Sequence, residues 1–212
     1  MLKYGRVALV AIAGVLAMPA AQAQGSFFVG VHAGQATLSD SGFPDDSSDT
    51  QSLAVGYRWQ AGESPVQIGI EGGIGRLGEL SHSVTWPQGS EHFDMDADYA
   101  FIGANARFPF GRDSRWFAVA RAGYMGYDQT LDYRHQETFN GQSYSSAQRY
   151  EDEGGGAYFG AGIGVDVTPN FNISAMLNGY AYARIYDDGD RYRFEDDVDT
   201  ARTVTLGLEL RF

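Results

Sequence analysis

The segment TVTLGLELRF, residues 203–212, alternates apolar side chains with polar or small ones up to its last residue. The apolar positions are Val204, Leu206, Leu208, Leu210 and Phe212. Successive side chains of a β-strand point to opposite faces, so this pattern predicts a strand with one apolar face. No turn or cap follows Phe212, and an unpaired apolar edge strand invites aggregation. We therefore expect the first strand of the chain to pair with the last one in a closed barrel.

Period-two patterns recur along the rest of the chain, and signals for helices are weak. They predict strands at residues 26–36, 50–59, 65–77, 93–108, 115–134, 149–168, 171–186 and 196–212. Short connections rich in turn-forming residues lie at 60–65, 109–114 and 168–170, and long, acidic ones are centred near 37–49, 78–92, 135–148 and 187–197. Short turns at one end and long loops at the other are typical of outer-membrane barrels.

The two faces of the expected strands differ in charge. One face is apolar and carries no charged residue, whereas the other carries Arg58, Glu71, Asn105, Arg107, Arg121, Asp166, Asn172, Asn178, Glu209 and Arg211. If the charged face met lipid, Arg121 alone would cost about 2–4 kcal/mol at the bilayer midplane. The sequence therefore predicts an all-β fold, an eight-stranded antiparallel up-and-down transmembrane β-barrel with its charges inside. The alternative is a soluble lipocalin-like barrel, in which the polarity of the two faces is reversed.

The first residues have the features of a secretory signal peptide. Lys3 and Arg6 precede an apolar run over residues 7–18, and the small residues Ala21 and Ala23 form a cleavage site. The run is shorter than the roughly 18 residues that a membrane-spanning helix needs. We expect residues 1–23 to be removed as a signal peptide and residues 24–212 to form the barrel domain.

Composition excludes several classes of function. The sequence has no cysteine, so neither a disulfide framework nor a thiolate metal site is available. It contains 15 Lys and Arg residues against 27 Asp and Glu residues, a formal net charge of −12 at pH 7. This balance argues against nucleic acid as a partner, because nucleic-acid-binding surfaces are basic. We expect no cofactor.

The C-terminal segment resembles the assembly signal of bacterial outer-membrane proteins, which ends in an aromatic residue preceded by alternating apolar ones. Residues 26–212, including the glycine-rich AYFGAGIGVDV at 157–167, are similar to the small eight-stranded outer-membrane β-barrel superfamily that includes the OmpA transmembrane domain, OmpX, Opa and Ail. The resemblance implies a monomer in the outer membrane of a Gram-negative bacterium. It also implies outer-membrane lipid, lipopolysaccharide and the barrel-assembly machinery as partners.

Glu71 and Arg121 fall at similar depth on the charged face, so we expect them to form an ion pair in the middle of the lumen. An eight-stranded interior is just wide enough for side chains to fill. Such a pair is compatible with a gate in a narrow ion pore. It is equally compatible with a packed polar plug, which we favour.

Asp94, Asp96 and Asp98 lie on one face of an expected strand, outward and just above the apolar band. Their carboxylates suit Ca²⁺ or Mg²⁺, and lipopolysaccharide phosphates could complete such a site. A solvated acidic strand is the simpler interpretation of the same residues. We therefore expect no metal centre and keep these three residues as weak candidates.

Two classes of function remain for such a barrel. In the first, a non-enzymatic protein presents four long acidic extracellular loops for envelope integrity, adhesion or host interaction. In the second, an enzyme modifies lipid A and uses a serine activated by one of the histidines His32, His82, His92 and His135. Ser81 and Ser83 flank His82, but in an expected loop. We favour the first class.

Deletion of Phe212 is expected to slow assembly, because the chain would lose the terminal aromatic residue of the assembly signal. Pulse-chase labelling followed by cell fractionation would then show unfolded chain accumulating in the periplasm. Insertion at the normal rate would show that the terminal pattern has no role in assembly.

Overall fold

The computed structural model describes residues 25–39, 47–111, 113–139, 142–187, 192–194 and 198–212. The expected signal peptide therefore lies outside the described residues. The strands are β1 (Gly25–Leu38), β2 (Ser47–Gln60), β3 (Gln67–Trp86), β4 (Gly89–Pro109), β5 (Trp116–Phe139), β6 (Gln142–Thr168), β7 (Phe171–Asp187), β8 (Tyr192–Phe194) and β9 (Asp199–Arg211). None of the described residues forms a helix long and apolar enough to cross a membrane.

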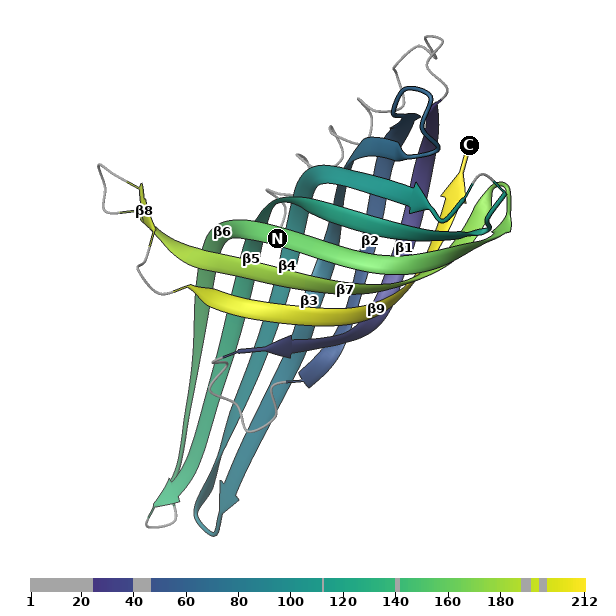
Figure 1. Ribbon diagram of the computed structural model, residues 1–212. Coiled ribbons are helices and arrows are strands. Elements are labelled where there is room, and N and C mark those ends of the chain that lie inside the picture. The colour runs from purple at the N-terminus through teal and green to yellow at the C-terminus, as the bar shows by residue number, and fades with distance from the viewer. Residues whose placement is uncertain (1–24, 40–46, 112, 140–141, 188–191, 195–197) are drawn as a thin grey trace.

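All strands except the short β8 form one closed antiparallel ring (Figure 1). Each strand pairs with its neighbours in sequence, β7 pairs with β9, and β9 closes the ring by pairing with β1. The closing register places Val29 opposite Leu210 and Leu38 opposite Ala201. Beyond it, the Phe212 backbone N–H donates to the Phe27 carbonyl at 2.9 Å. The expected eight-stranded barrel is confirmed, and β9 has a partner on both sides.

The outer surface of the ring is apolar. Its exposed side chains include Val31, Ile70, Ile74, Ile102, Tyr124, Phe159, Ile163, Leu177, Val204, Leu206, Leu208 and Leu210. Every polar residue expected on the inner face is buried or half-buried. A soluble protein rarely exposes a contiguous apolar patch larger than a few hundred Å². The lipocalin-like alternative, with an apolar lumen and a polar outside, is therefore wrong.

Strands β3 to β6 are longer than the sequence predicts. The expected long loops at 78–92 and 135–148 are wrong, because the described parts of both segments are paired strand apart from the turn at 87–88. The apolar alternation ends near the bilayer boundary, but the strands continue beyond it. The sequence pattern therefore predicted strand ends that are too early. Beyond that point, hydrogen bonds and cross-strand rings such as Phe93 and Tyr133, whose centroids lie 4.9 Å apart, continue the pairing.

These extensions form a four-stranded sheet that projects beyond the rest of the barrel, toward the bottom of Figure 1. We call residues 79–86, 89–96, 130–139 and 142–151 the projecting sheet. The pairing of β2 with β3 ends at Arg76, and that of β6 with β7 ends at Gly154, so neither neighbour follows the sheet outward. The expected loops near 37–49 and 187–197 lie partly outside the described residues.

The opposite end of the barrel has the short connections that the sequence predicts. Segments 61–66, 110–115 and 169–170 join β2 to β3, β4 to β5 and β6 to β7. Gly62 has a φ of 63°, a left-handed conformation that glycine adopts without steric cost. Both Gly25 and Phe212 lie at this short-turn end, since β1 starts there and β9 ends there.

Backbone amides at 80–85 and 90–95 should exchange with solvent more slowly than the amides of Gly62 and Glu63, because the former are paired in a β-ladder and the latter lie in a turn. Hydrogen–deuterium exchange of the protein in lipid nanodiscs measures both segments in one sample. Equal exchange rates in the two segments would show that the projecting sheet is a loop in solution.

Candidate functional site

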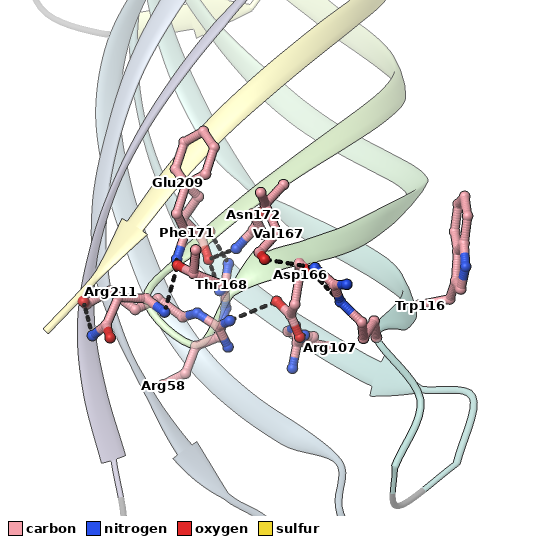
Figure 2. Close-up of polar contacts among 12 residues, drawn as sticks. Arg58, Arg107, Trp116, Asp166, Val167, Thr168, Phe171, Asn172, Glu209 and Arg211 are labelled. Atoms are coloured by element: carbon pink, nitrogen blue, oxygen red, sulfur yellow. Dashed lines mark hydrogen bonds and ion pairs between the residues drawn. The ribbon is translucent and has the colours of Figure 1, made fainter.

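The lumen near the short-turn end contains a network of ion pairs (Figure 2). Arg58 Nη1 and Nη2 donate to the two carboxylate oxygens of Glu209 at 2.7 and 2.8 Å, a bidentate pair. Asn172 Nδ2 donates to the same carboxylate at 2.9 Å. The Arg58 side chain is only 5% exposed, so this pair is protected from solvent screening.

A second carboxylate at this end joins two arginines. Asp166 accepts from Arg107 Nη2 and from Arg211 Nη2, both at 2.5 Å (Figure 2). Two of the guanidinium groups also lie over aromatic rings. Arg58 Cζ is 4.0 Å from the ring centroid of Phe28, and Arg107 Cζ is 4.0 Å from that of Phe117. Charged groups and aromatic rings are therefore packed against one another at this end of the lumen.

The structure brings Glu71 and Arg121 to the same level, but at the edge of ion-pair range. Arg121 Nη1 lies 3.9 Å from Glu71 Oε1. The nearer partners of the carboxylate are neutral: Tyr158 Oη donates to it at 2.8 Å and Asn105 Nδ2 at 3.1 Å. Asn105 Oδ1 also accepts from Arg58 Nε at 2.6 Å. Glu71 is thus connected through one amide to the stronger pair of Arg58 with Glu209.

Above this level the lumen is filled by a hydrophobic cluster that our sequence analysis missed. Its aromatic members are Tyr99, Phe101, Tyr127, Tyr158, Tyr180 and Tyr182. Ring centroids of Tyr127 and Tyr182 lie 4.7 Å apart, and those of Phe101 and Tyr158 lie 5.2 Å apart. These residues continue the inward alternation of the charged face, so extending that alternation along each strand would have identified them.

Glycines opposite Tyr158 make room for its ring. A Cβ atom at Gly103 would lie 2.4 Å from Tyr158 Oη, and one at Gly123 would lie 2.7 Å from Tyr158 Cε1. Real Cβ atoms do not approach other heavy atoms so closely. Part of the high glycine content is therefore explained by the space that the aromatic cluster needs.

The acidic run at 94–98 points outward, as the alternation predicts, with Met95 and Ala97 buried on the other face. Asp98 Oδ1 accepts from Arg76 Nε at 3.0 Å, and Asp94 Oδ2 lies 2.9 Å from His92 Nε2. Asp96 lies between them on the same face. No group of three or more His, Cys, Asp or Glu among the described residues is placed to hold a metal ion.

One serine–histidine contact lies on the outer face of the projecting sheet. Ser83 Oγ lies 2.5 Å from His92 Nδ1, and His92 Nε2 contacts Asp94 in turn. Ser83 and His92 are directly opposite each other on β3 and β4. Our sequence analysis noted Ser83 only as a neighbour of His82, because the cross-strand register was hidden in an expected loop.

Comparison with known proteins identifies the family. Residues 7–212 match the family described as the outer membrane protein β-barrel domain. The chain belongs to this outer-membrane β-barrel family. It is therefore a protein of the Gram-negative outer membrane, with its apolar band in lipid and its charges in the lumen. No curated protein matches the chain.

Solved structures with the same fold share little sequence with this barrel. The Ail protein of Yersinia pestis is 18% identical with a TM-score of 0.48, covering 91% of this chain and 100% of that one. Neisserial surface protein A is 16% identical with a TM-score of 0.42, covering 88% and 97%. A major outer membrane protein from Thermus thermophilus is 13% identical with a TM-score of 0.50, covering 89% and 99%.

The position of the barrel in the membrane places Ser83 far from the lipid. Ile74 is the last exposed apolar residue of β3 before Arg76, and Ser83 follows it by nine positions along the strand. At about 3.3 Å per residue and a tilt near 40°, this corresponds to roughly 20 Å above the apolar band. The acyl esters of lipid A, which lie at the edge of that band, are out of reach.

The terminal pattern lies on the outside of this outer-membrane barrel. Val204, Leu206, Leu208, Leu210 and Phe212 are all exposed on the lipid-facing side of β9 and its end. They are therefore accessible to another protein before the barrel closes. Their role as an assembly signal stays a prediction.

Double-mutant cycles should rank the ion pairs by their geometry. We expect a coupling free energy of about 1–3 kcal/mol between Arg58→Met and Glu209→Gln, because the pair is bidentate and buried. A smaller coupling is expected between Arg121→Met and Glu71→Gln, since their charged groups lie 3.9 Å apart. Urea unfolding in lipid vesicles, followed by the gel-mobility difference between unheated and boiled samples, measures each.

The exposed pair of Arg76 with Asp98 is the matched control, because its side chains are 42% and 61% exposed. It should contribute at most about 1 kcal/mol. If the losses of stability for Arg58→Met and Glu209→Gln are additive, the two side chains do not interact.

In planar bilayers, Glu71→Gln should leave the conductance unchanged, because the aromatic cluster still closes the lumen.

Proposed function

We propose that this protein is a non-enzymatic integral outer-membrane protein that presents the projecting sheet and its acidic loops outside the cell for adhesion or host interaction. The observation that carries the proposal is the sheet itself. It extends past the last contacts of β2 and β7, and no lipid-facing band requires it. Because the barrel closes without the projecting sheet, the sheet is available to bind a partner.

The side chains of the projecting sheet support a binding role. Tyr144 and Tyr150 are each 55% exposed, and Val84 is 43% exposed. Tyrosine is enriched in interfaces because it combines a large rigid contact area with a polar tip. We further propose that residues 1–23 are a cleaved signal peptide, and that the barrel-assembly machinery recognises the terminal apolar pattern.

Envelope integrity and a narrow ion pore are the alternative roles for the same barrel. The pore is disfavoured by the lumen, where buried ion pairs and the aromatic cluster occupy successive levels. A structure of Ail has been solved with sucrose octasulfate, a heparin analogue. The projecting sheet here is acidic, so a sulfated ligand of that kind would be repelled.

A hydrolase is the second candidate function, and the contacts of Ser83 with His92 and of His92 with Asp94 favour it. A serine nucleophile also needs donors for the oxyanion. Strand N–H groups lie in the plane of the sheet, whereas Ser83 Oγ stands perpendicular to it. We therefore assign these contacts to cross-strand pairing on a solvated face.

The protein should not react with a fluorophosphonate probe. If the probe does label the protein and Ser83→Ala abolishes the labelling, the protein is a hydrolase instead.

Trimming the projecting sheet should abolish adhesion without affecting the barrel. The variant replaces residues 81–94 and 132–149 by Asn-Gly turns, which join the directly opposed pairs Leu80–Met95 and Leu131–Tyr150. We expect bacteria that carry it to bind host cells and extracellular matrix as weakly as the gene deletion does. Membrane fractionation and the gel-mobility shift check that the barrel is intact.

The same strains should keep a normal permeability barrier toward detergents and large antibiotics. If the deletion strain adheres normally but leaks, envelope integrity is the function. If the trimmed protein supports full adhesion, the projecting sheet is not the binding element.

A further inference from the structure

Both faces of the projecting sheet carry acidic residues, but they differ in where the arginines lie. The face that continues the inner wall of the barrel carries Leu80, His82, Val84, Trp86, Glu91, Phe93, Met95, Leu131, Tyr133, His135, Glu137, Tyr144, Gln148 and Tyr150. Met95 and Leu131 fix this assignment, because both pack on the hydrophobic cluster of the lumen. This inner face has aromatic and acidic side chains and, among the described residues, neither arginine nor lysine.

Both arginines of the sheet, Arg134 and Arg149, lie on the other face. Arg149 contacts Glu151 at 3.2 Å and Asp132 at 3.8 Å there. Arg149 thus has acidic partners on its own face. Among the described residues, the inner-face carboxylates Glu91 and Glu137 both contact His135, and Glu91 also accepts from Tyr133.

Aromatic rings and carboxylates alternate on the inner face. Glu91 Oε1 accepts from Tyr133 Oη at 3.0 Å and lies 3.2 Å from His135 Nδ1. The other side of the His135 ring faces Glu137, at 3.7 Å. Ring centroids of Trp86 and His135 lie 5.9 Å apart. A cation that approaches this face therefore meets a carboxylate and the π-face of a ring together.

The base of the sheet is negative on its outer face. Asp98, Asp128 and Glu153 are directly opposed on β4, β5 and β6. Burial, then the charges of Glu153, Glu151 and Asp98, raise the pKa of Asp128. These carboxylates lie on the outer face, so they add to the negative field around the base of the sheet, which accelerates the association of cations and repels anions, but they are not part of the inner face.

We propose that the inner face of the projecting sheet binds a basic polypeptide segment, whose arginine or lysine side chains pair with Glu91 and Glu137 and stack on Tyr144 and Tyr150. This inference rests on the proposed function and names the partner class of the same surface. Tyr144 and Tyr150 are six positions apart on β6, which is about 20 Å at 3.3 Å per residue. A ligand that contacts both is an extended chain and not a single ion.

The test measures binding of a fluorescein-labelled oligo-arginine peptide to the full protein in nanodiscs of zwitterionic lipid, by fluorescence anisotropy at low salt. Tyr144→Leu with Tyr150→Leu should weaken binding about tenfold at unchanged net charge. Glu91→Gln with Glu137→Gln should also weaken it about tenfold, and glutamine keeps an acceptor for Tyr133. An oligo-glutamate peptide should not bind.

The matched control is Glu79→Gln with Glu151→Gln, which removes the same charge from the outer face of the same sheet. We expect it to change the affinity about twofold or less. Equal losses for the inner-face and outer-face pairs would overturn the proposal, because binding would then follow net charge alone. Displacement of the peptide by a neutral oligosaccharide, with no effect of the glutamate changes, would overturn it in favour of a carbohydrate ligand.

The two proposals fail separately. If the trimmed variant loses adhesion but the full protein does not bind the basic peptide, the adhesive role stands and the proposed partner class is wrong. If the peptide binds with the expected dependence on Tyr144 and Tyr150 but adhesion is unaffected by trimming, the binding site stands and the adhesive role is wrong.

Discussion

The pairing of β1 with β9 is the constraint on which the rest of this protein depends. Hydrocarbon offers no water to the backbone, so every N–H and C=O group in the bilayer must bond to another strand. The register from Phe28 opposite Arg211 to Leu38 opposite Ala201 provides this for the first and last strands. Once the ring is closed, period-two alternation places alternate side chains in lipid and in the lumen.

The narrow lumen then determines which side chains can be there. Arg58, Glu71, Arg121 and Glu209 cannot face lipid, and inside they are stabilised only if their charges and hydrogen-bonding groups are satisfied. Asn105 connects the two pairs by accepting from Arg58 and donating to Glu71. The aromatic cluster fills the space above them. Such an interior makes a rigid anchor and leaves binding to the part of the protein outside the membrane.

The projecting sheet is free of the lipid constraint. Beyond the level of Leu80 and Met95 the apolar alternation is no longer required, and the strands are held by ladder bonds and cross-strand rings. The two faces nevertheless differ, because both arginines lie on the outer face together with acidic residues, whereas Glu91 and Glu137 on the inner face lie beside His135 and aromatic rings. The proposed basic ligand would supply the arginine or lysine side chains that the inner face itself lacks.

The sequence by itself determined the barrel, its eight strands, the short-turn end and the direction of its charged face. Alternation and the cost of a charge in lipid act locally, so they can be read from a residue and its neighbours. Only the tertiary structure decided that Arg58 pairs with Glu209, that Asn105 lies between the two pairs and that Ser83 meets His92. Those contacts depend on the stagger between strands, which no single strand encodes. The length of β3 to β6 was also hidden, because outside the bilayer a paired strand does not need an apolar face.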